Sequence, residues 1–169
     1  MKIEDKLDSG PVLASKELVF GQNATYGEIQ KKLSLMGSNL LIESLKNIEN
    51  GKAKFIDQVH SNSTYAKKID KNETKINWNL EVNKVIAHIH GLSPNPGAWF
   101  KYDAERFKVL RVNKSTINGN PGTLLDENLT IACKSDSIQI LEIQRQGKNK
   151  QTTKDFLLGK KISKSSILT

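Results

Sequence analysis

The stretch Gly91-Leu-Ser-Pro-Asn-Pro-Gly-Ala-Trp-Phe100 divides the sequence into a part with helical periodicity and a part with the pattern of short strands. Gly91 tolerates the left-handed conformation that commonly ends a helix, and Pro94 and Pro96 cannot continue one because they lack an N–H and have a fixed φ. Each proline also favours an extended backbone at the residue before it. The stretch therefore predicts a helix end, a rigid turn and then a strand that begins at Trp99 and Phe100.

Patterns on the two sides of this stretch support that prediction. Before it, Val82, Val85, Ile86 and Ile89 follow the potential N-cap Asn79 at helical spacing, which predicts a short amphipathic helix ending at Gly91. After it, apolar alternation and turn residues predict five short strands and a closing helix. The strands are expected at residues 99–102, 107–117, 123–125, 129–133 and 138–144, and the helix at residues 155–159. Five such strands are typical of a small barrel of the oligonucleotide/oligosaccharide-binding (OB) type.

The first fifty residues have a different pattern. Residues 11–20 have the composition of a strand, and Thr25 with Glu28 has the spacing of a capping box that opens a helix with periodic apolar residues up to Ile48. Gly37 is expected to divide this helix in two. Because the strand has no visible neighbours, residues 1–50 look like the end of a larger domain. Residues 51–72 are expected to form a linker, and residues 73–169 a second domain.

The net charge of +8 belongs to the second part of the chain. Residues 1–60 carry eight lysines and eight acidic residues, whereas residues 61–169 carry the whole positive excess. Such a charge attracts polyanions, of which nucleic acid is the usual one, although a merely solvated basic surface explains it equally well. The candidates for phosphate contact are five lysines in two clusters: Lys67, Lys68, Lys71, Lys148 and Lys150.

Aromatic and basic residues alternate twice near the start of the expected sheet, in Phe100-Lys101-Tyr102 and in Arg106-Phe107-Lys108. Sheet faces that bind single-stranded nucleic acid combine such residues, because bases stack on aromatic rings while phosphates pair with cations. Packing of the aromatic rings in the core explains the same pattern. Both interpretations stay open at this point.

Several classes of function are disfavoured. No run approaches the ~18 apolar residues of a membrane helix, and the charged start Met1-Lys-Ile-Glu-Asp5 does not resemble a signal peptide, so we expect a cytoplasmic protein with no membrane partner. The single cysteine, Cys133, lies in an apolar alternation and is expected in the core. His88 and His90 are two residues apart and point to different faces of the expected helix, so no metal site is predicted.

Seven stretches, in order along the whole chain, resemble the C-terminal half of the methionyl-tRNA formyltransferase family. They are Leu7-Asp8-Ser9-Gly10-Pro11-Val12-Leu13, Thr64-Tyr65-Ala66-Lys67-Lys68-Ile69, Ile76-Asn77-Trp78, the opening stretch that ends at Phe100, Pro121-Gly122-Thr123, Gly147-Lys148 and Asp155-Phe156-Leu157. The resemblance implies an α+β chain. Its parts are the C-terminal remnant of a Rossmann-like formyltransferase domain, a linker, and an OB-like β-barrel domain that helps to hold tRNA.

The resemblance also implies a chemistry, which is transfer of a formyl group from 10-formyltetrahydrofolate to the methionine of initiator tRNA, without a metal. The resemblance implies a catalytic trio of Asn, His and Asp, which formyltransferases of this kind have in common. Asp8 stands at the position of the Asp. A carboxylate beside a histidine would hold that ring protonated while the amine attacks. The region with the Asn, the His and most of the folate pocket has no counterpart in these 169 residues. The alternative is a turn-stabilising role of Asp8 before Ser9-Gly10-Pro11, and the resemblance favours the catalytic role.

We therefore expect a truncated or split methionyl-tRNA formyltransferase of translation initiation that is inactive by itself. The alternative is a tRNA- or RNA-binding OB module that stands free or complements another polypeptide. In the complementing case, the strand expected at residues 11–20 would dock on a separately encoded N-terminal half. Initiator tRNA is the expected partner.

Overall fold

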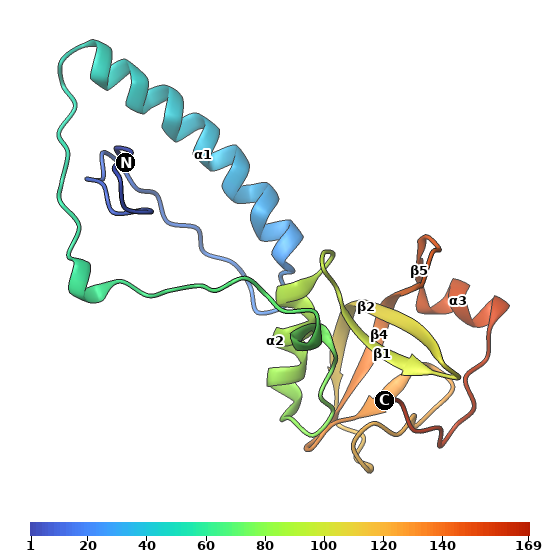
Figure 1. Ribbon diagram of the computed structural model, residues 1–169. Coiled ribbons are helices and arrows are strands. Elements are labelled where there is room, and N and C mark those ends of the chain that lie inside the picture. Colours follow the sequence, from blue (N-terminus) through green and yellow to red (C-terminus); the bar gives the residue numbers. More distant parts are fainter. The chain divides into compact units, whose positions relative to one another are not determined.

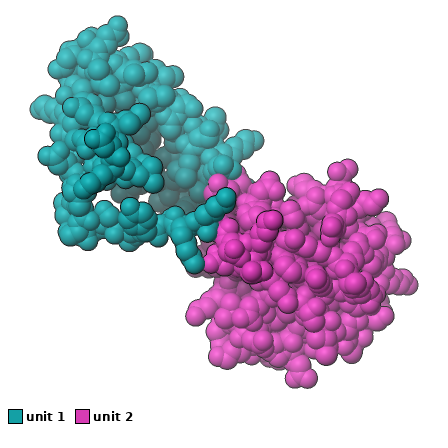
Figure 2. All heavy atoms as spheres, in the orientation of Figure 1, with its two compact units in different colours: residues 1–21, 28–68 teal, residues 22–27, 69–169 magenta.

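The computed structural model describes every residue from Met1 to Thr169. The chain is of the α+β class and forms two compact units, shown in different colours in Figure 2. Unit 1 consists of residues 1–21 and 28–68, and unit 2 of residues 22–27 and 69–169. Every residue of the hydrophobic core cluster belongs to unit 2.

Unit 1 is dominated by one long helix, α1 (Tyr26–Glu49), drawn in light blue to teal in Figure 1. The helix runs through Gly37 without a break, so the predicted division is wrong. A glycine inside a helix costs only ~1 kcal/mol relative to alanine, which the turns on either side tolerate. The strand predicted at residues 11–20 is also wrong, because Val12 pairs with Ile56 in a single antiparallel bridge and no strand forms. A short 3-10 turn, η1 (His60–Asn62), completes the unit.

Unit 2 is built on an antiparallel sheet of five strands, which Figure 1 shows with helices beside it. The strand order is β1-β2-β4-β3, and β5 pairs with β4. The strands are β1 (Ala98–Tyr102), β2 (Glu105–Ser115), β3 (Thr130–Ala132), β4 (Ser137–Arg145) and β5 (Lys150–Thr152). The helices are the 3-10 turn η2 (Asn72–Thr74), α2 (Val82–Leu92) and α3 (Thr153–Gly159).

The sequence pattern located β1, β2, β3, β4 and α3 to within a few residues. The strand expected at residues 123–125 forms only isolated bridges, Thr123 with Ile167 and Leu124 with Ile131. β5 was not expected, because its three residues are polar and exposed and carry no apolar alternation. The five strands do not close into a barrel, since β1 and β3 stay at the ends of the strand order. No closed barrel is thus seen, and the OB-like character of this domain stays a prediction.

The stretch from Gly91 to Phe100 ends α2 and begins β1, as predicted, but by different local means. Gly91 lies inside α2, and the positive φ of the stretch is found at Gly97, where it is +85°. A Cβ on Gly97 would lie 2.9 Å from the Cδ of Lys108 and 3.2 Å from the carbonyl oxygen of Pro94. The turn therefore requires glycine at position 97 for both its conformation and its space.

Three phenylalanines join β1, β2 and α3 in the core. Phe100 and Phe107 stack with ring centroids 5.4 Å apart, and Phe156 meets Phe107 edge-on at 5.9 Å. At the rim of this cluster, Arg145 donates to the Glu105 carboxylate through Nε at 2.7 Å, and the ammonium group of Lys160 stands over the Phe107 ring at 5.1 Å. The bond from Arg145 is the main cause that lowers the pKa of Glu105. Phe100 and Phe107 of the hairpin are thus part of the core.

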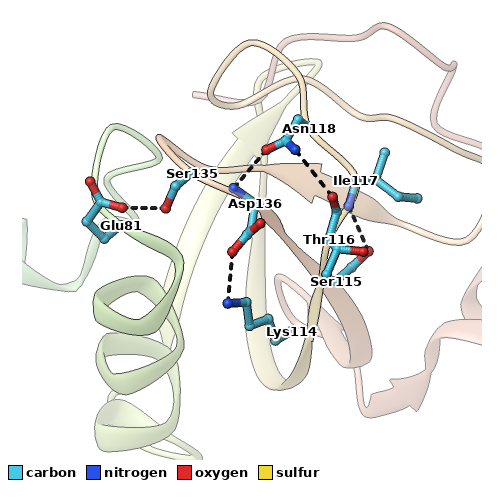
Figure 3. Close-up of polar contacts among 8 residues, drawn as sticks. All are labelled: Glu81, Lys114, Ser115, Thr116, Ile117, Asn118, Ser135 and Asp136. Atoms are coloured by element: carbon cyan, nitrogen blue, oxygen red, sulfur yellow. Dashed lines mark hydrogen bonds and ion pairs between the residues drawn. The ribbon is translucent and has the colours of Figure 1, made fainter.

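Polar contacts connect the turn between β3 and β4 to α2 and to the end of β2, as Figure 3 shows. α2 begins after Glu81, so the prediction of Asn79 as the N-cap is wrong. The hydroxyl of Ser135 donates to the Glu81 carboxylate, and this bond is the main cause that lowers the pKa of Glu81. On the other side of the turn, Lys114 and Asp136 form an ion pair of 2.8 Å. The helix start is therefore held by a contact distant in sequence.

Cys133 is buried in unit 2, as predicted, with 1% of its surface exposed. Burial raises the pKa of its thiol to about 11. At neutral pH the thiol is therefore protonated as well as shielded, and both properties slow its reaction with thiol reagents. Because it is the only cysteine of the chain, its reactivity reports on the opening of unit 2.

Candidate nucleic-acid interface

The hairpin of β1 and β2 has two different faces, one with buried phenylalanines and one with basic side chains and Trp99. Side chains alternate along a strand, so burial of the two hairpin phenylalanines places Trp99, Lys101, Arg106 and Lys108 on the opposite face. In the antiparallel register, Trp99 lies beside Lys108 and Lys101 lies beside Arg106. We name these four residues the basic face. Neighbours in such a register have Cβ atoms only ~5 Å apart, so the face is one continuous surface.

The row that begins at Trp99 continues across the sheet. Lys108 is in register with Gln144 of β4, and Gln144 is in register with Lys150 of β5. With neighbouring strands ~4.8 Å apart, the row from Trp99 to Lys150 spans roughly 14 Å. The Gln144 amide donates to the carbonyl oxygen of Lys148 at 2.8 Å, which holds the turn between β4 and β5 in place. An aromatic ring therefore stands at one end of a strip that carries lysines at the other.

Trp99 is held from two sides. Its indole Nε1 donates to the hydroxyl of the buried Thr74 at 2.9 Å, and that hydroxyl donates to the carbonyl oxygen of Lys71 at 2.7 Å. The guanidinium carbon of Arg106 lies over the Trp99 ring, 4.2 Å from its centroid. Hydrogen bonding of the indole and the cation–π contact together fix the ring in one position.

A pocket of about 280 Å³ opens beside this pair. One wall consists of cationic side chains of β2 and the other of the end of β4 and its turn. Its lining residues are Arg106, Lys108, Gln144, Arg145, Gln146 and Gly147. The positive φ of Gly147, +71°, allows the tight turn, and the backbone N–H of Gln146 donates to the carbonyl oxygen of Arg106 at 3.1 Å. The pocket thus combines cations with amide groups.

The three cations of the basic face have no acidic partner. Lys101, Arg106 and Lys108 take part in no ion pair, whereas Arg145 pairs with Glu105 at 2.7 Å and Lys150 with Glu142 at 3.5 Å. Cations that are close to one another and uncompensated produce a positive potential that attracts polyanions. A nucleic-acid backbone is a polyanion with closely spaced charges, to which such a cluster is complementary in charge.

The structure places the five predicted lysines in different surroundings. Lys148 lies in the β4–β5 turn and Lys150 begins β5, in the row that continues from the basic face. Lys71 precedes η2, and its carbonyl oxygen takes part in the network that holds Trp99. Lys67 and Lys68 are exposed in unit 1 and are not brought together with the other three in one unit.

The interpretation of the alternating aromatic residues as a stacking surface is wrong for Phe100 and Phe107, which are both 0% exposed. Core packing accounts for them. The partly exposed aromatic residues of β1 are instead Trp99 and Tyr102, and Trp99 belongs to the basic face. The signal that identifies Trp99 is its position next to Phe100, because consecutive side chains of a strand point to opposite faces.

Asp8 lies in unit 1, in an exposed loop where its φ is 53°. Its backbone carbonyl accepts a hydrogen bond from the side-chain amide of Gln58 at 2.9 Å. Its carboxylate makes no hydrogen bond or ion pair. A hydrogen bond from the carboxylate that would stabilise the turn before Ser9-Gly10-Pro11 is therefore also missing. A solvated carboxylate without a partner is not positioned for proton transfer.

The side chains of unit 1 do not fit a folate. No buried polar side-chain atom of this unit lacks a partner, so none awaits a ligand. One cavity of about 460 Å³ is lined mainly by apolar residues of α1 and of the segments around Leu13 and Phe55, and another of about 550 Å³ by polar and charged residues around Glu4 and Asp5. A ligand rich in polar atoms needs a small number of well-placed buried polar groups. No reaction step through 10-formyltetrahydrofolate follows from these residues.

No three His, Cys, Asp or Glu side chains come close enough to hold a metal ion. His90 is buried, and its Nε2 accepts a hydrogen bond from the backbone N–H of Val112 at 3.2 Å. Burial lowers the pKa of His88. None of the helices combines the length and the apolar character needed to cross a membrane.

Comparison with known proteins decides the family. The model of the family described as formyl transferase, C-terminal domain, matches residues 68–161. The chain belongs to the formyl transferase family. It is 37% identical to the methionyl-tRNA formyltransferase of Chelativorans sp. (strain BNC1) and 39% identical to that of Pelagibacter ubique (strain HTCC1062). These alignments cover 100% of this chain and 56% and 55% of the relatives. The chain thus spans about half the length of the curated relatives it matches, and the resemblance to their C-terminal part is confirmed.

Two solved structures have a similar fold. HypX from Aquifex aeolicus in complex with tetrahydrofolic acid matches with a TM-score of 0.72 at 17% identity, over 98% of this chain and 32% of that chain. The N-formyltransferase from Helicobacter canadensis matches with a TM-score of 0.63 at 15% identity, over 85% of this chain and 53% of that chain. At these identities the likeness concerns the fold alone.

Proposed function

We propose that this chain supplies the C-terminal, tRNA-holding part of a methionyl-tRNA formyltransferase, and that the basic face of unit 2 contacts the tRNA. The observation that carries the proposal is the group of three uncompensated cations beside a pocket at the β4–β5 turn. The family relation supports an OB-like character of unit 2 and a Rossmann-like origin of residues 1–50. The proposed substrate is initiator Met-tRNA, used in translation initiation, a process of the cytoplasm.

Roles for the remaining predicted residues belong to the same proposal. Lys148 and Lys150 extend the basic face, and Lys67, Lys68 and Lys71 provide further phosphate contacts. Asp8 is the proposed catalytic carboxylate of the complete enzyme, which uses 10-formyltetrahydrofolate. Because its carboxylate has no partner among these residues, the histidine and asparagine that it requires must come from another segment.

Changing Lys101 and Lys108 together to glutamine is expected to weaken binding of an initiator tRNA transcript and to flatten its salt dependence. Each phosphate contact contributes roughly 0.7 to 0.9 to the slope of log affinity against log salt concentration. Loss of two contacts therefore lowers the magnitude of this slope by about 1.5. Filter binding of the full chain at five or more salt concentrations measures it.

The matched control removes two positive charges from unit 1 by changing the exposed Lys31 and Lys32 of α1 to glutamine. We expect this variant to keep the slope of the unmodified chain, although its net charge falls by the same amount. If both variants lowered the magnitude of the slope equally, binding of tRNA would depend on the net charge and not on the basic face. Failure of the unmodified chain to retain tRNA at low salt would refute the proposed function.

This 169-residue chain by itself is expected to transfer no formyl group to charged initiator tRNA. The physical reason is the solvated and unpartnered carboxylate of Asp8 and the lack of a fitting folate site in unit 1. Product formation is measured with 10-formyltetrahydrofolate against a sample without protein, and with a full-length relative as positive control. Formylation that disappears in Asp8→Asn would contradict the expectation, because it would place the reaction within these residues.

A second candidate function, docking onto a formyltransferase segment, is favoured by the apolar surface of unit 1. No residue of α1 is buried, and Leu41, Leu45 and Ile48 are each 50–59% exposed. The curated relatives extend beyond the aligned part by nearly half of their length. We propose that such a segment, joined to this chain or separate from it, covers α1. Hydrogen exchange of α1 with and without that segment tests the proposal.

A further inference from the structure

The contacts of the Arg106 guanidinium differ from those of an ordinary phosphate-binding arginine. Its guanidinium carbon lies 4.2 Å from the centroid of the Trp99 ring, and the same side chain lines the pocket of about 280 Å³. Its Nε is buried and has no hydrogen-bond partner. One side of the group is therefore covered by an indole, while the group also borders a pocket open to a ligand.

The support beneath Arg106 is rigid. The Trp99 indole is anchored to Thr74, a residue that is 3% exposed, so the ring cannot rotate away without losing its hydrogen bond. Lys101 is the cross-strand neighbour of Arg106, and Lys108 is that of Trp99. Each member of the stacked pair thus has a lysine as its neighbour on the adjacent strand.

From this arrangement we infer that Arg106, supported by Trp99, is a stacking platform for one unpaired RNA base. A guanidinium plane stacks on bases as aromatic rings do, and such contacts are made by bases that are not enclosed in a duplex. Lys101 and Lys108 bind the phosphates on the two sides of that nucleotide. The inference rests on the proposed tRNA binding and adds to it that an unpaired nucleotide is the group recognised.

The pocket supports a single base. Its volume of about 280 Å³ is near the lower limit of ~300 Å³ for small-ligand sites, which leaves room for one flat group. The amide of Gln146 lines the pocket and offers a donor and an acceptor to a base edge. A duplex would present its phosphates to the same cations but would keep the faces of its bases inside its own stack.

The test compares two RNA probes with equal numbers of phosphates, a single-stranded oligoribonucleotide of mixed sequence and a blunt-ended duplex whose bases are all paired. Arg106→Lys keeps the charge and removes the plane. It is expected to weaken binding of the single strand at least fivefold more than binding of the duplex, whereas Lys101→Gln weakens both alike. The single strand should also quench the fluorescence of Trp99, and this signal should vanish in Trp99→Phe, because Trp78, the other tryptophan, is only 5% exposed.

Each outcome decides one of the two proposals. A loss in Arg106→Lys that is equal for the two probes, or tryptophan fluorescence unchanged by bound single strand, would overturn the platform while leaving tRNA binding intact. No binding of either probe or of tRNA by the unmodified chain would refute the proposed function, and the platform with it. The reactivity of Cys133 in each variant shows that unit 2 is still folded, so that lost binding cannot be ascribed to unfolding.

Discussion

Replacing Phe107 with alanine is expected to lower the free energy of unfolding of unit 2 by about 3–5 kcal/mol. Phe107 is 0% exposed and lies between Phe100, at 5.4 Å between ring centroids, and Phe156, at 5.9 Å. Its removal leaves a cavity that three elements border, and it takes away the ring over which Lys160 is placed. Since whole domains are stable by only ~5–15 kcal/mol, this single change uses a large part of the stability.

The measurement uses Cys133 as a reporter that belongs to unit 2 alone. The rate of thiol modification is followed as urea is increased, and the midpoint is compared between variants. The matched control is Leu158→Ala in α3, where the side chain is 83% exposed and a change within about 0.5 kcal/mol is expected. A loss below 1 kcal/mol in Phe107→Ala would mean that the three-ring cluster does not hold β1, β2 and α3 together.

The same residue explains why part of the site was predictable. Alternation in a half-buried strand gives each side chain one of two faces, and a shift by one residue would exchange them all. Once Phe107 is in the core, Arg106 and Lys108 must face outward. The two faces of the β1–β2 hairpin could therefore be obtained from the sequence, although the aromatic residues could not be assigned to core or surface without knowing which face was covered.

The row from Trp99 to Lys150 was beyond sequence reasoning for a different reason. It depends on the pairing of β2 with β4, which are far apart in the chain, and on a bulge between Val109 and Arg111 that shifts the register. It also depends on β5, whose exposed polar residues carry no strand signal. Local clustering of lysines selected Lys67 and Lys68 as well as Lys148 and Lys150, because neighbours in sequence are visible and neighbours across strands are not.

The sequence pattern predicted the helix α1, but it did not determine whether the apolar residues of this helix are buried. Periodic apolar residues predict a helix that packs against something, and in this chain they are not covered. The expected strand beside it failed because its only partner is the single bridge between Val12 and Ile56. Apolar periodicity predicts that one face of a helix is covered. The surface that covers this face can belong to another segment or to another molecule.

Amide hydrogens of α1 are expected to exchange at least about a thousandfold faster than those of β4, a difference of about 4 kcal/mol in opening free energy at 1.4 kcal/mol per tenfold. α1 has no buried residue, and most of the stability of a helix in a protein comes from tertiary packing of its apolar face. In β4, Ile138, Ile140 and Ile143 are at most 1% exposed and the strand is paired on both sides, so its amides exchange only when unit 2 unfolds. Hydrogen exchange followed by mass spectrometry measures both elements in one sample.

Addition of a formyltransferase segment of the kind that the relatives possess should then slow exchange in α1 and leave β4 unchanged. Leu45→Lys, which puts a charge into the apolar surface of α1, should abolish that protection, whereas Lys46→Gln on the same turn should keep it. If α1 of the chain alone were as protected as β4, its apolar surface would have to be covered by another copy of the chain. Sedimentation would then show a dimer, and protection would fall on dilution, because a cover supplied by a second molecule depends on concentration.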